Sequence, residues 1–150
     1  MCGIVGYVGL DTAPDGNKFD HNAYDVVLEG LRRQEYRGYD SAGVALVCPD
    51  GIEFRKKAGK LLNLENEVKE HPLPKSQIGI GHTRWATHGG PTDVNAHPHV
   101  VDNGRLAVVH NGIIENFAEL RAELLAEGVE FTSQTDTEVA AATIASIYNK

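Results

Sequence analysis

The sequence predicts one globular domain in which short strands alternate with helices, so the expected fold is a mixture of both. A length of 150 residues suits a single domain with a core of its own. The composition, 41% hydrophobic and 23% charged, is that of an ordinary globular protein and excludes a disordered chain. Short apolar runs also alternate with stretches of helical periodicity, without internal repeats or low-complexity tracts.

The predicted strands are apolar runs bounded by glycine or turn residues. The first covers residues 4–8 and stops at Gly9. Two more, at 42–47 and 53–57, flank the sequence Pro49-Asp50-Gly51, which is typical of a hairpin turn. Further strands are expected at 78–81, 106–109 and 129–132.

The first predicted helix follows a polar segment, residues 11–20, that is rich in turn residues and is expected to be an exposed loop. Asn22 is its expected N-cap, with Asp25 three residues later. The expected apolar face of this helix consists of Val27, Leu28 and Leu31.

Two further helices are predicted in the last third of the chain. One begins near Asn116 and stops at Gly128, with an apolar face expected from Phe117, Leu120, Leu124 and Leu125. The other begins after Thr135, with Glu138 completing a capping box. Its apolar pattern, through Val139, Ile144 and Ile147, still continues at residue 150, which predicts that the chain is a fragment.

Charge and cysteine content exclude several classes of protein. Fourteen basic and 21 acidic residues give a net charge of -7, which makes nucleic acid an unsuitable partner. No apolar stretch reaches the ~18 residues of a membrane span, and a signal peptide is missing. Since Cys2 and Cys48 form neither a CxxC pair nor a disulfide framework, we expect a reducing, cytoplasmic location.

Cys2 is the strongest functional clue, because removal of Met1 would make a thiol the first side chain of the chain. A terminal cysteine combines a nucleophile with a base, since a free α-amine titrates near ~7.7–8.0 and a thiol near ~8.5. N-terminal threonine nucleophiles are activated in the same way. The alternative is a chance Met-Cys start with a small buried cysteine.

Five histidines suggest a rival class, a zinc site. His82, His88, His97, His99 and His110 lie within 29 residues, but no HExxH, no paired CxxC and no carboxylate at a ligand spacing accompanies them. We therefore expect no metal and no cofactor. A third alternative is a non-catalytic interaction module.

Four segments carry a family resemblance, and they are Cys2-Gly3-Ile4-Val5-Gly6, Glu35-Tyr36-Arg37-Gly38-Tyr39-Asp40-Ser41-Ala42-Gly43, Gly81-His82-Thr83-Arg84-Trp85-Ala86-Thr87-His88-Gly89 and His110-Asn111-Gly112-Ile113-Ile114-Glu115-Asn116. The chain resembles the class II, N-terminal-nucleophile glutamine amidotransferases from Met1 to Ile147. The second and third segments are most similar to the branch that transfers glutamine nitrogen to fructose 6-phosphate. Another class II amidotransferase remains the alternative within the family.

The resemblance implies an α+β fold, a four-layer αββα sandwich of the N-terminal-nucleophile hydrolase type, with the nucleophile at the end of the first strand. Residues 1–150 would be the N-terminal portion of the glutaminase domain, without its remainder and without the sugar isomerase domains. Segment 11–22 would be a surface insertion relative to compact relatives. Such a chain would at most hydrolyse L-glutamine, and the full enzyme would be a homodimer.

The resemblance also implies roles for individual residues. Cys2 would be the nucleophile, and Asn111 and Gly112 would stabilise the oxyanion, although Asn-Gly is also a common turn. Arg84 would bind the α-carboxylate of glutamine through its planar fork. Asp136 would bind the α-ammonium, although an aspartate at a helix start also complements the helix dipole.

The remaining implied roles surround this centre. Thr87 and His88 would lie on a loop that closes over glutamine, with Gly89-Gly90-Pro91 as its hinge. Trp85 would contact the ammonia route, and His97 would belong to the substrate site. Arg37 would favour the thiolate, or would form only a surface salt bridge.

Overall fold

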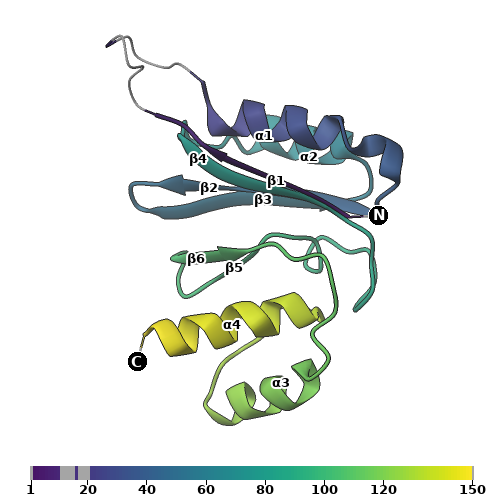
Figure 1. Cartoon of the computed structure of the whole chain (residues 1–150), viewed down its shortest axis with the longest axis vertical. Coiled ribbons are helices and arrows are strands. Elements are labelled where there is room, and N and C mark those ends of the chain that lie inside the picture. The colour runs from purple at the N-terminus through teal and green to yellow at the C-terminus, as the bar shows by residue number, and fades with distance from the viewer. Residues whose placement is uncertain (1, 11–15, 17–20, 150) are drawn as a thin grey trace.

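The chain folds into four layers, two of helices on the outside and two of strands between them (Figure 1). The computed structural model describes residues 2–10, 16 and 21–149. An antiparallel sheet of four strands has the order β1-β4-β2-β3, and a two-stranded ribbon, β5-β6, lies below it. The strands are β1 (Gly3–Val8), β2 (Ser41–Cys48), β3 (Gly51–Ala58), β4 (Ile78–Arg84), β5 (His99–Val101) and β6 (Leu106–Val108).

The helices form the two outer layers. The helices α1 (Ala23–Arg32) and α2 (Leu61–Glu70) cover the outer face of the larger sheet, and α3 (Phe117–Ala126) and α4 (Asp136–Tyr148) lie beyond the ribbon. A 3-10 turn, Glu35–Arg37, follows α1. This layering confirms the predicted α+β fold of the αββα type.

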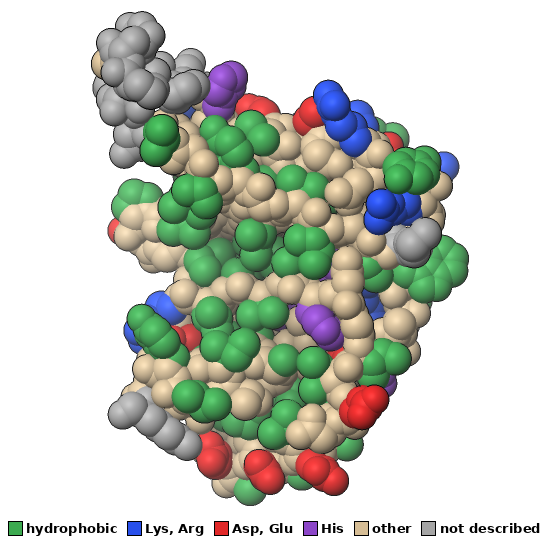
Figure 2. Space-filling model, in the orientation of Figure 1, with side chains coloured by type: hydrophobic (Ala, Val, Ile, Leu, Met, Phe, Trp, Pro, Cys, Tyr) green, Lys and Arg blue, Asp and Glu red, His purple; other side chains and the backbone are tan. Residues whose placement is uncertain are grey.

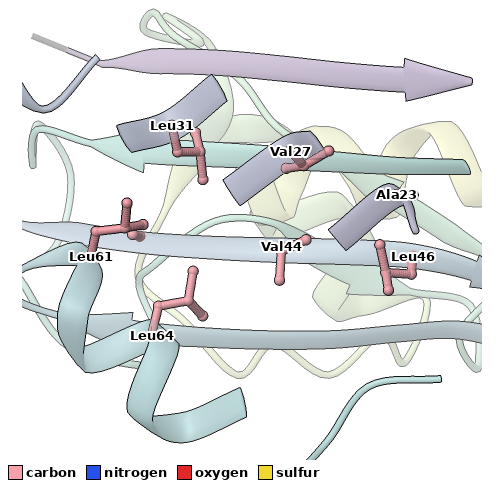
Figure 3. Packing of buried hydrophobic residues seen from close by; sticks show 8 residues of the cluster. Ala23, Val27, Leu31, Val44, Leu46, Leu61 and Leu64 are labelled. Atoms are coloured by element: carbon pink, nitrogen blue, oxygen red, sulfur yellow. The ribbon is translucent and has the colours of Figure 1, made fainter. Parts of the chain in front are cut away.

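The main core lies between the larger sheet and the helices α1 and α2 (Figure 3). Strand β2 contributes every second residue to it, as the pleat requires, and these are Ala42, Val44 and Leu46. Leu31 of α1 and Leu64 of α2 are fully buried against them. Burial of each such leucine contributes about 1.5–3 kcal/mol, so this layer anchors the sheet on which the site is built.

The opposite face of the larger sheet packs against the segment that leads into β5. Gly43 of β2 pairs with His82 of β4 and faces this side. A Cβ at Gly43 would lie 2.0 Å from the carbonyl oxygen of His97, so only glycine allows the segment to approach this closely. Lys56 of β3 holds the same segment, because its Nζ donates to the carbonyl oxygens of Val94 (3.1 Å) and Ala96 (2.9 Å).

A second, smaller core joins α3 to α4, where Leu124 packs with Val139 and Ala142. The far sides of these helices are apolar but exposed. Leu125, Ile144 and Ile147 are 53%, 47% and 67% exposed, so these members of the two apolar patterns lie outside the core. Figure 2 shows hydrophobic side chains spread across the face that carries the sheet edges, and acidic side chains grouped at the lower end of the molecule.

Most predicted elements are confirmed, with three corrections. Strand β4 extends three residues beyond 81, and the sequence reasoning missed α2 and β5. The predicted strand at 129–132 is absent, because the Thr132 N–H donates to the Glu138 carboxylate, not to a neighbouring strand. The loop and insertion predicted over 11–22 lie mostly outside the described residues.

The predicted helix N-caps at Asn22 and Thr135 are confirmed, and each side chain accepts a backbone N–H of its own first turn. The predicted cap at Asn116 begins α3 without a side-chain hydrogen bond. Within the described ranges, no helix combines the length and hydropathy that crossing a bilayer requires.

Candidate active site

The thiol of Cys2 lies beside the turn that follows β4. Strands β1 and β4 pair with Gly3 opposite Thr83, so the start of β1 meets the end of β4. The backbone N–H of Trp85 donates to Cys2 Sγ at 3.1 Å. This contact joins the thiol to a residue 83 positions away in the sequence.

Asp40 fixes that turn. Its Oδ2 accepts from the Ala86 N–H at 2.6 Å, and its own N–H donates to the carbonyl oxygen of Arg84 at 2.7 Å. The two bonds clamp the backbone on both sides of Trp85. Asp40 therefore helps to hold in place the N–H that contacts the thiol.

Arg84 is almost fully buried, and its guanidinium ties down the segment that follows the turn. It donates to the carbonyl oxygens of Gly90 (3.2 Å), Gly89 (3.3 Å) and His88. Burial lowers its pKa, and the negative charges of Asp40 and Asp136 oppose this shift. Since the ordinary pKa of arginine is above 12, the group remains a cation at neutral pH.

Asp136 is the first residue of α4 and is 3% exposed. Its Oδ2 accepts from the Ile114 N–H at 2.8 Å and lies 3.8 Å from Nδ1 of His88. Both contacts use Oδ2, and Asp136 also lines the cavity described below. The position also complements the helix dipole, so both interpretations of Asp136 remain compatible with the structure.

Glu138 holds the start of α4 in place. Its carboxylate accepts from the backbone N–H groups of Thr132 (2.9 Å) and Ser133 (2.7 Å) and from both hydroxyl groups of these residues. Burial alone would raise the pKa of Glu138, but these hydrogen bonds outweigh it and lower the pKa below its usual value. The network fixes the segment just before Asp136.

Asn111 and Gly112 follow β6 and are exposed. Oδ1 of Asn111 lies 2.5 Å from Nε2 of His82, on the central strand β4. Glycine suits position 112 for a steric reason, because a Cβ there would lie 2.7 Å from Nε2 of His110. The contact between Asn111 and His82 therefore ties the Asn-Gly turn to the central strand β4.

Three buried histidines form a stack beneath this turn. The ring centroids of His82 and His97 are 4.5 Å apart, and those of His97 and His99 are 4.7 Å apart. Burial lowers the pKa of His82 to about 4 and that of His99 to about 3, and it lowers the pKa of His97 as well. In the described part of the chain, no three His, Cys, Asp or Glu side chains form a group that could hold a metal ion.

One small cavity brings most of the predicted site residues together. Its volume is about 30 Å³, the share of one water molecule in the liquid. The residues that line it are Cys2, Arg84, Trp85, Thr87, His97, His110, Gly112, Asp136 and Thr137. Seven of these nine were predicted as site residues.

Three predicted residues lie outside the lining of this cavity. Asn111 is connected to it through the neighbouring Gly112, and His88 lies behind Asp136 with its ring against Phe117. Arg37 is exposed on the 3-10 turn, where its guanidinium lies 5.6 Å from the centroid of the Tyr36 ring.

Sequence reasoning assigned no site role to four residues that border the site. Asp40, His82 and His110 stand inside the segments that carry the family resemblance, so their position was a usable signal. Thr137 follows Asp136 directly, and its hydroxyl lies 3.4 Å from Nδ1 of His110. A larger groove, about 700 Å³, lies between α4 and residues 129–132, away from the thiol.

Solved structures show the class of protein that this fold represents. The chain is similar to the glutamine phosphoribosylpyrophosphate amidotransferase from B. subtilis, with a TM-score of 0.72 and 26% identity, over 95% of this chain and 29% of that one. A second similar structure is described as the allosteric regulatory enzyme of purine biosynthesis, with a TM-score of 0.69 and 29% identity, over 91% of this chain and 28% of that one. The fold is that of the N-terminal-nucleophile amidotransferases.

The sequence comparisons identify the family. Residues 68–148 match the glutamine amidotransferase domain, and the chain belongs to the glutamine amidotransferase family. It is 67% identical over 149 residues to the glutamine–fructose-6-phosphate aminotransferase (isomerizing) of Corynebacterium diphtheriae, and 56% identical over 141 residues to that of Thermus thermophilus. These matches cover 99% and 94% of this chain but only 23% and 22% of the relatives, so the chain spans about a quarter of their length.

Proposed function

We propose that the chain is the glutaminase portion of a longer amidotransferase and that Cys2 attacks the side-chain amide of L-glutamine. One observation carries this proposal: Cys2, Arg84 and Asp136 line a single cavity, so a thiol, a cation and a carboxylate belong to one site. Glutamine presents an amide, an α-carboxylate and an α-ammonium, and the thiol, the cation and the carboxylate of these side chains are their chemical complements.

The proposed reaction has two steps. The thiolate of Cys2 adds to the amide carbon, the carbonyl electron pair moves to oxygen, and the C–N bond then breaks to release ammonia and a γ-glutamyl thioester. Water next adds to the thioester and the C–S bond breaks, which releases glutamate and regenerates the thiol. The α-amine of Cys2, freed by removal of Met1, would take the thiol proton and give it to the leaving nitrogen. Met1 itself lies outside the described residues.

The oxyanion of both tetrahedral intermediates needs donors, and we assign them to the Asn111 amide and the Gly112 N–H. Gly112 lines the cavity with Cys2, and Asn111 is held next to it by His82. Each donor of this kind typically contributes about 10²–10³ to kcat.

The two charged ends of glutamine would bind Arg84 and Asp136. A cavity of about 30 Å³ is too small for an amino acid, and the carbonyl oxygens of residues 88–90 accept from Arg84. We therefore propose that segment 87–91 moves away from Arg84 as glutamine enters and closes again over it, with Gly89 at φ 74° in the hinge.

The other predicted residues act at the edge of the site in this proposal. Thr87 and His88 belong to the moving segment, and His97 lines the pocket floor. Trp85, 54% exposed, lies at the side by which ammonia would leave. Arg37 acts on the thiolate only at long range, or remains a surface residue.

The name of the relatives supports a wider proposal. In the longer protein, the released ammonia would be transferred to fructose 6-phosphate, in the cytoplasm and within a homodimer. We likewise propose that residues 1–150 are the N-terminal portion of the glutaminase domain.

Covalent labelling tests the glutaminase proposal directly. The glutamine analogue 6-diazo-5-oxo-norleucine is expected to add once, at Cys2, with loss of dinitrogen, and excess glutamine is expected to block the reaction. Intact mass and peptide mapping measure the adduct and report whether Met1 is removed. Cys48→Ser is the matched control, because burial raises the pKa of that thiol and its loss is expected to leave labelling unchanged.

Cys2→Ser is expected to abolish both labelling and glutamine hydrolysis. Hydrolysis at the wild-type rate in Cys2→Ser, or an adduct at Cys48 in the wild-type protein, would show that the nucleophile is misassigned.

A further inference from the structure

His82 occupies a position that a packing role alone does not explain. It lies in the middle of β4, between β1 and β2, with its side chain fully buried. A polar ring in the centre of a sheet is costly unless it is hydrogen-bonded. Its ring hydrogen-bonds to the side chain of Asn111, 29 residues further along the chain, and to the backbone of His110.

The direction of the hydrogen bond to Asn111 depends on which ring nitrogen of His82 carries a proton. Burial lowers the pKa of His82 to about 4, although the bond to Asn111 raises it, so the ring is neutral near pH 7 and carries one N–H. The Asn111 carboxamide oxygen, which lies 2.5 Å from Nε2, can only accept. With the amide in this orientation the proton is on Nε2, and Nδ1, which is buried without a hydrogen-bond partner, is left unprotonated.

This bond selects one of two orientations of the Asn111 amide. A carboxamide turned by 180° exchanges its oxygen and its NH2 group. With a proton on Nε2 of His82, the turned form would bring two donors together, whereas the observed form pairs a donor with an acceptor. The NH2 group of Asn111 is thus left on the side away from His82.

We propose that His82 is a positioning residue, whose Nε2–H locks the Asn111 amide with its NH2 group presented to the oxyanion. The inference rests on the proposed function, since it assigns His82 a task within that reaction. Without the lock, the amide oxygen would spend part of the time facing the developing negative charge, and the rate would fall although glutamine still binds.

The neighbours of His82 explain how the ring itself keeps its orientation. His97 packs against its face, and His99 packs against His97. Nε2 of His99 lies 2.7 Å from Oγ1 of Thr135, the N-cap of α4. The stack thus runs from the His82 ring, which is fully buried, to the helix start that carries Asp136.

Two variants of similar size and polarity separate positioning from packing. In His82→Gln, the side-chain amide can place a donor near the Nε2 position, whereas in His82→Asn it reaches only the Nδ1 position. We expect His82→Asn to lower kcat for glutamine hydrolysis by about 10²-fold with KM changed less than about threefold, as for loss of an oxyanion donor. His82→Gln is expected to retain a kcat within about tenfold of the wild-type value.

A double variant supplies the readout that a purely structural role would not give. Since His82 acts through Asn111, His82→Asn combined with Asn111→Ala is expected to have the same kcat as Asn111→Ala alone. Circular dichroism and the rate of Cys2 alkylation by iodoacetamide check that each variant is folded.

The outcomes separate the oxyanion role of Asn111 from the positioning role of His82. If Asn111→Ala keeps the wild-type kcat, the oxyanion assignment in the proposed function fails. If Asn111→Ala is impaired but folded His82→Asn is not, or if the two losses multiply in the double variant, only the positioning role of His82 is overturned. Equal losses in His82→Gln and His82→Asn would also overturn it.

Discussion

Replacement of Gly43 by alanine is expected to damage the site from a distance, and the structure gives the size of the effect. The new Cβ would lie 2.0 Å from the carbonyl oxygen of His97, whereas ordinary contacts begin near 3.4 Å. The backbone at His97 must therefore retreat by 3.4 − 2.0 = 1.4 Å. Lys56 resists this movement, because its ammonium group holds the carbonyl oxygens of Val94 and Ala96.

Two consequences of Gly43→Ala are measurable. Overpacking of this kind costs typically about 1–3 kcal/mol of unfolding free energy. His97 also lines the candidate site, and a displacement of about 1 Å at a site can reduce the rate about 10²-fold. Urea unfolding measures the first effect, and ammonia release from glutamine measures the second.

Gly6→Ala is the matched control. Gly6 lies in β1 of the same sheet, and a Cβ there would meet nothing within 4 Å. We expect its stability to stay the same or to rise by less than about 1 kcal/mol. Wild-type stability and activity in Gly43→Ala, or equal damage in both variants, would refute the reasoning from close approach.

Three further predictions concern stability. Folding lowers the pKa of His82 and His99 from 6.5 to about 4 and about 3, so the unfolded chain binds more protons than the folded one below pH 6.5. The free energy of unfolding should therefore fall between pH 7 and pH 5, by up to about 2 kcal/mol per histidine. A urea midpoint that stays constant over this range would contradict the prediction. Glu138→Gln removes the charge from a buried acceptor of four hydrogen bonds. It should lower the free energy of unfolding by about 1.5–3 kcal/mol and speed hydrogen exchange of the backbone amides in the first turn of α4. Unchanged exchange would show that the network is not needed. Leu64→Ala, at a fully buried position, should lower the free energy of unfolding by about 2–5 kcal/mol, with a lower melting temperature. Leu62→Ala, at a position that is 58% exposed in the same helix, should change the melting temperature little. Equal shifts in the two variants would argue against the assigned core.

Local sequence signals predicted the elements whose hydrogen bonds are made within them or with an adjoining turn. The helix caps at Asn22 and Thr135 and the hairpin around Pro49-Asp50-Gly51 are of this kind. The prediction failed where a distant group changed the outcome. Residues 129–132 have strand-like composition, but the carboxylate of Glu138 takes the hydrogen bonds that a neighbouring strand would have made.

The candidate site shows the same division. Contiguous runs of chemically distinctive residues carry the family resemblance, so Cys2, Arg84 and Asn111 were singled out from the sequence. Their partners were harder to find. That Asp40 clamps the turn after β4, or that His82 reaches Asn111, depends on which strands lie next to each other.

The sequence by itself determined the family, the net charge and most of the helices and strands, because each of these is encoded in short runs of the chain. The tertiary structure alone decided that the thiol of Cys2 meets the Trp85 N–H, that Arg84 is engaged by the segment after it, and that three histidines stack as neutral rings. The physical reason is the strand order β1-β4-β2-β3 and the packing of a second layer on that sheet. These long-range contacts are set by the burial of whole faces, which local periodicity does not encode.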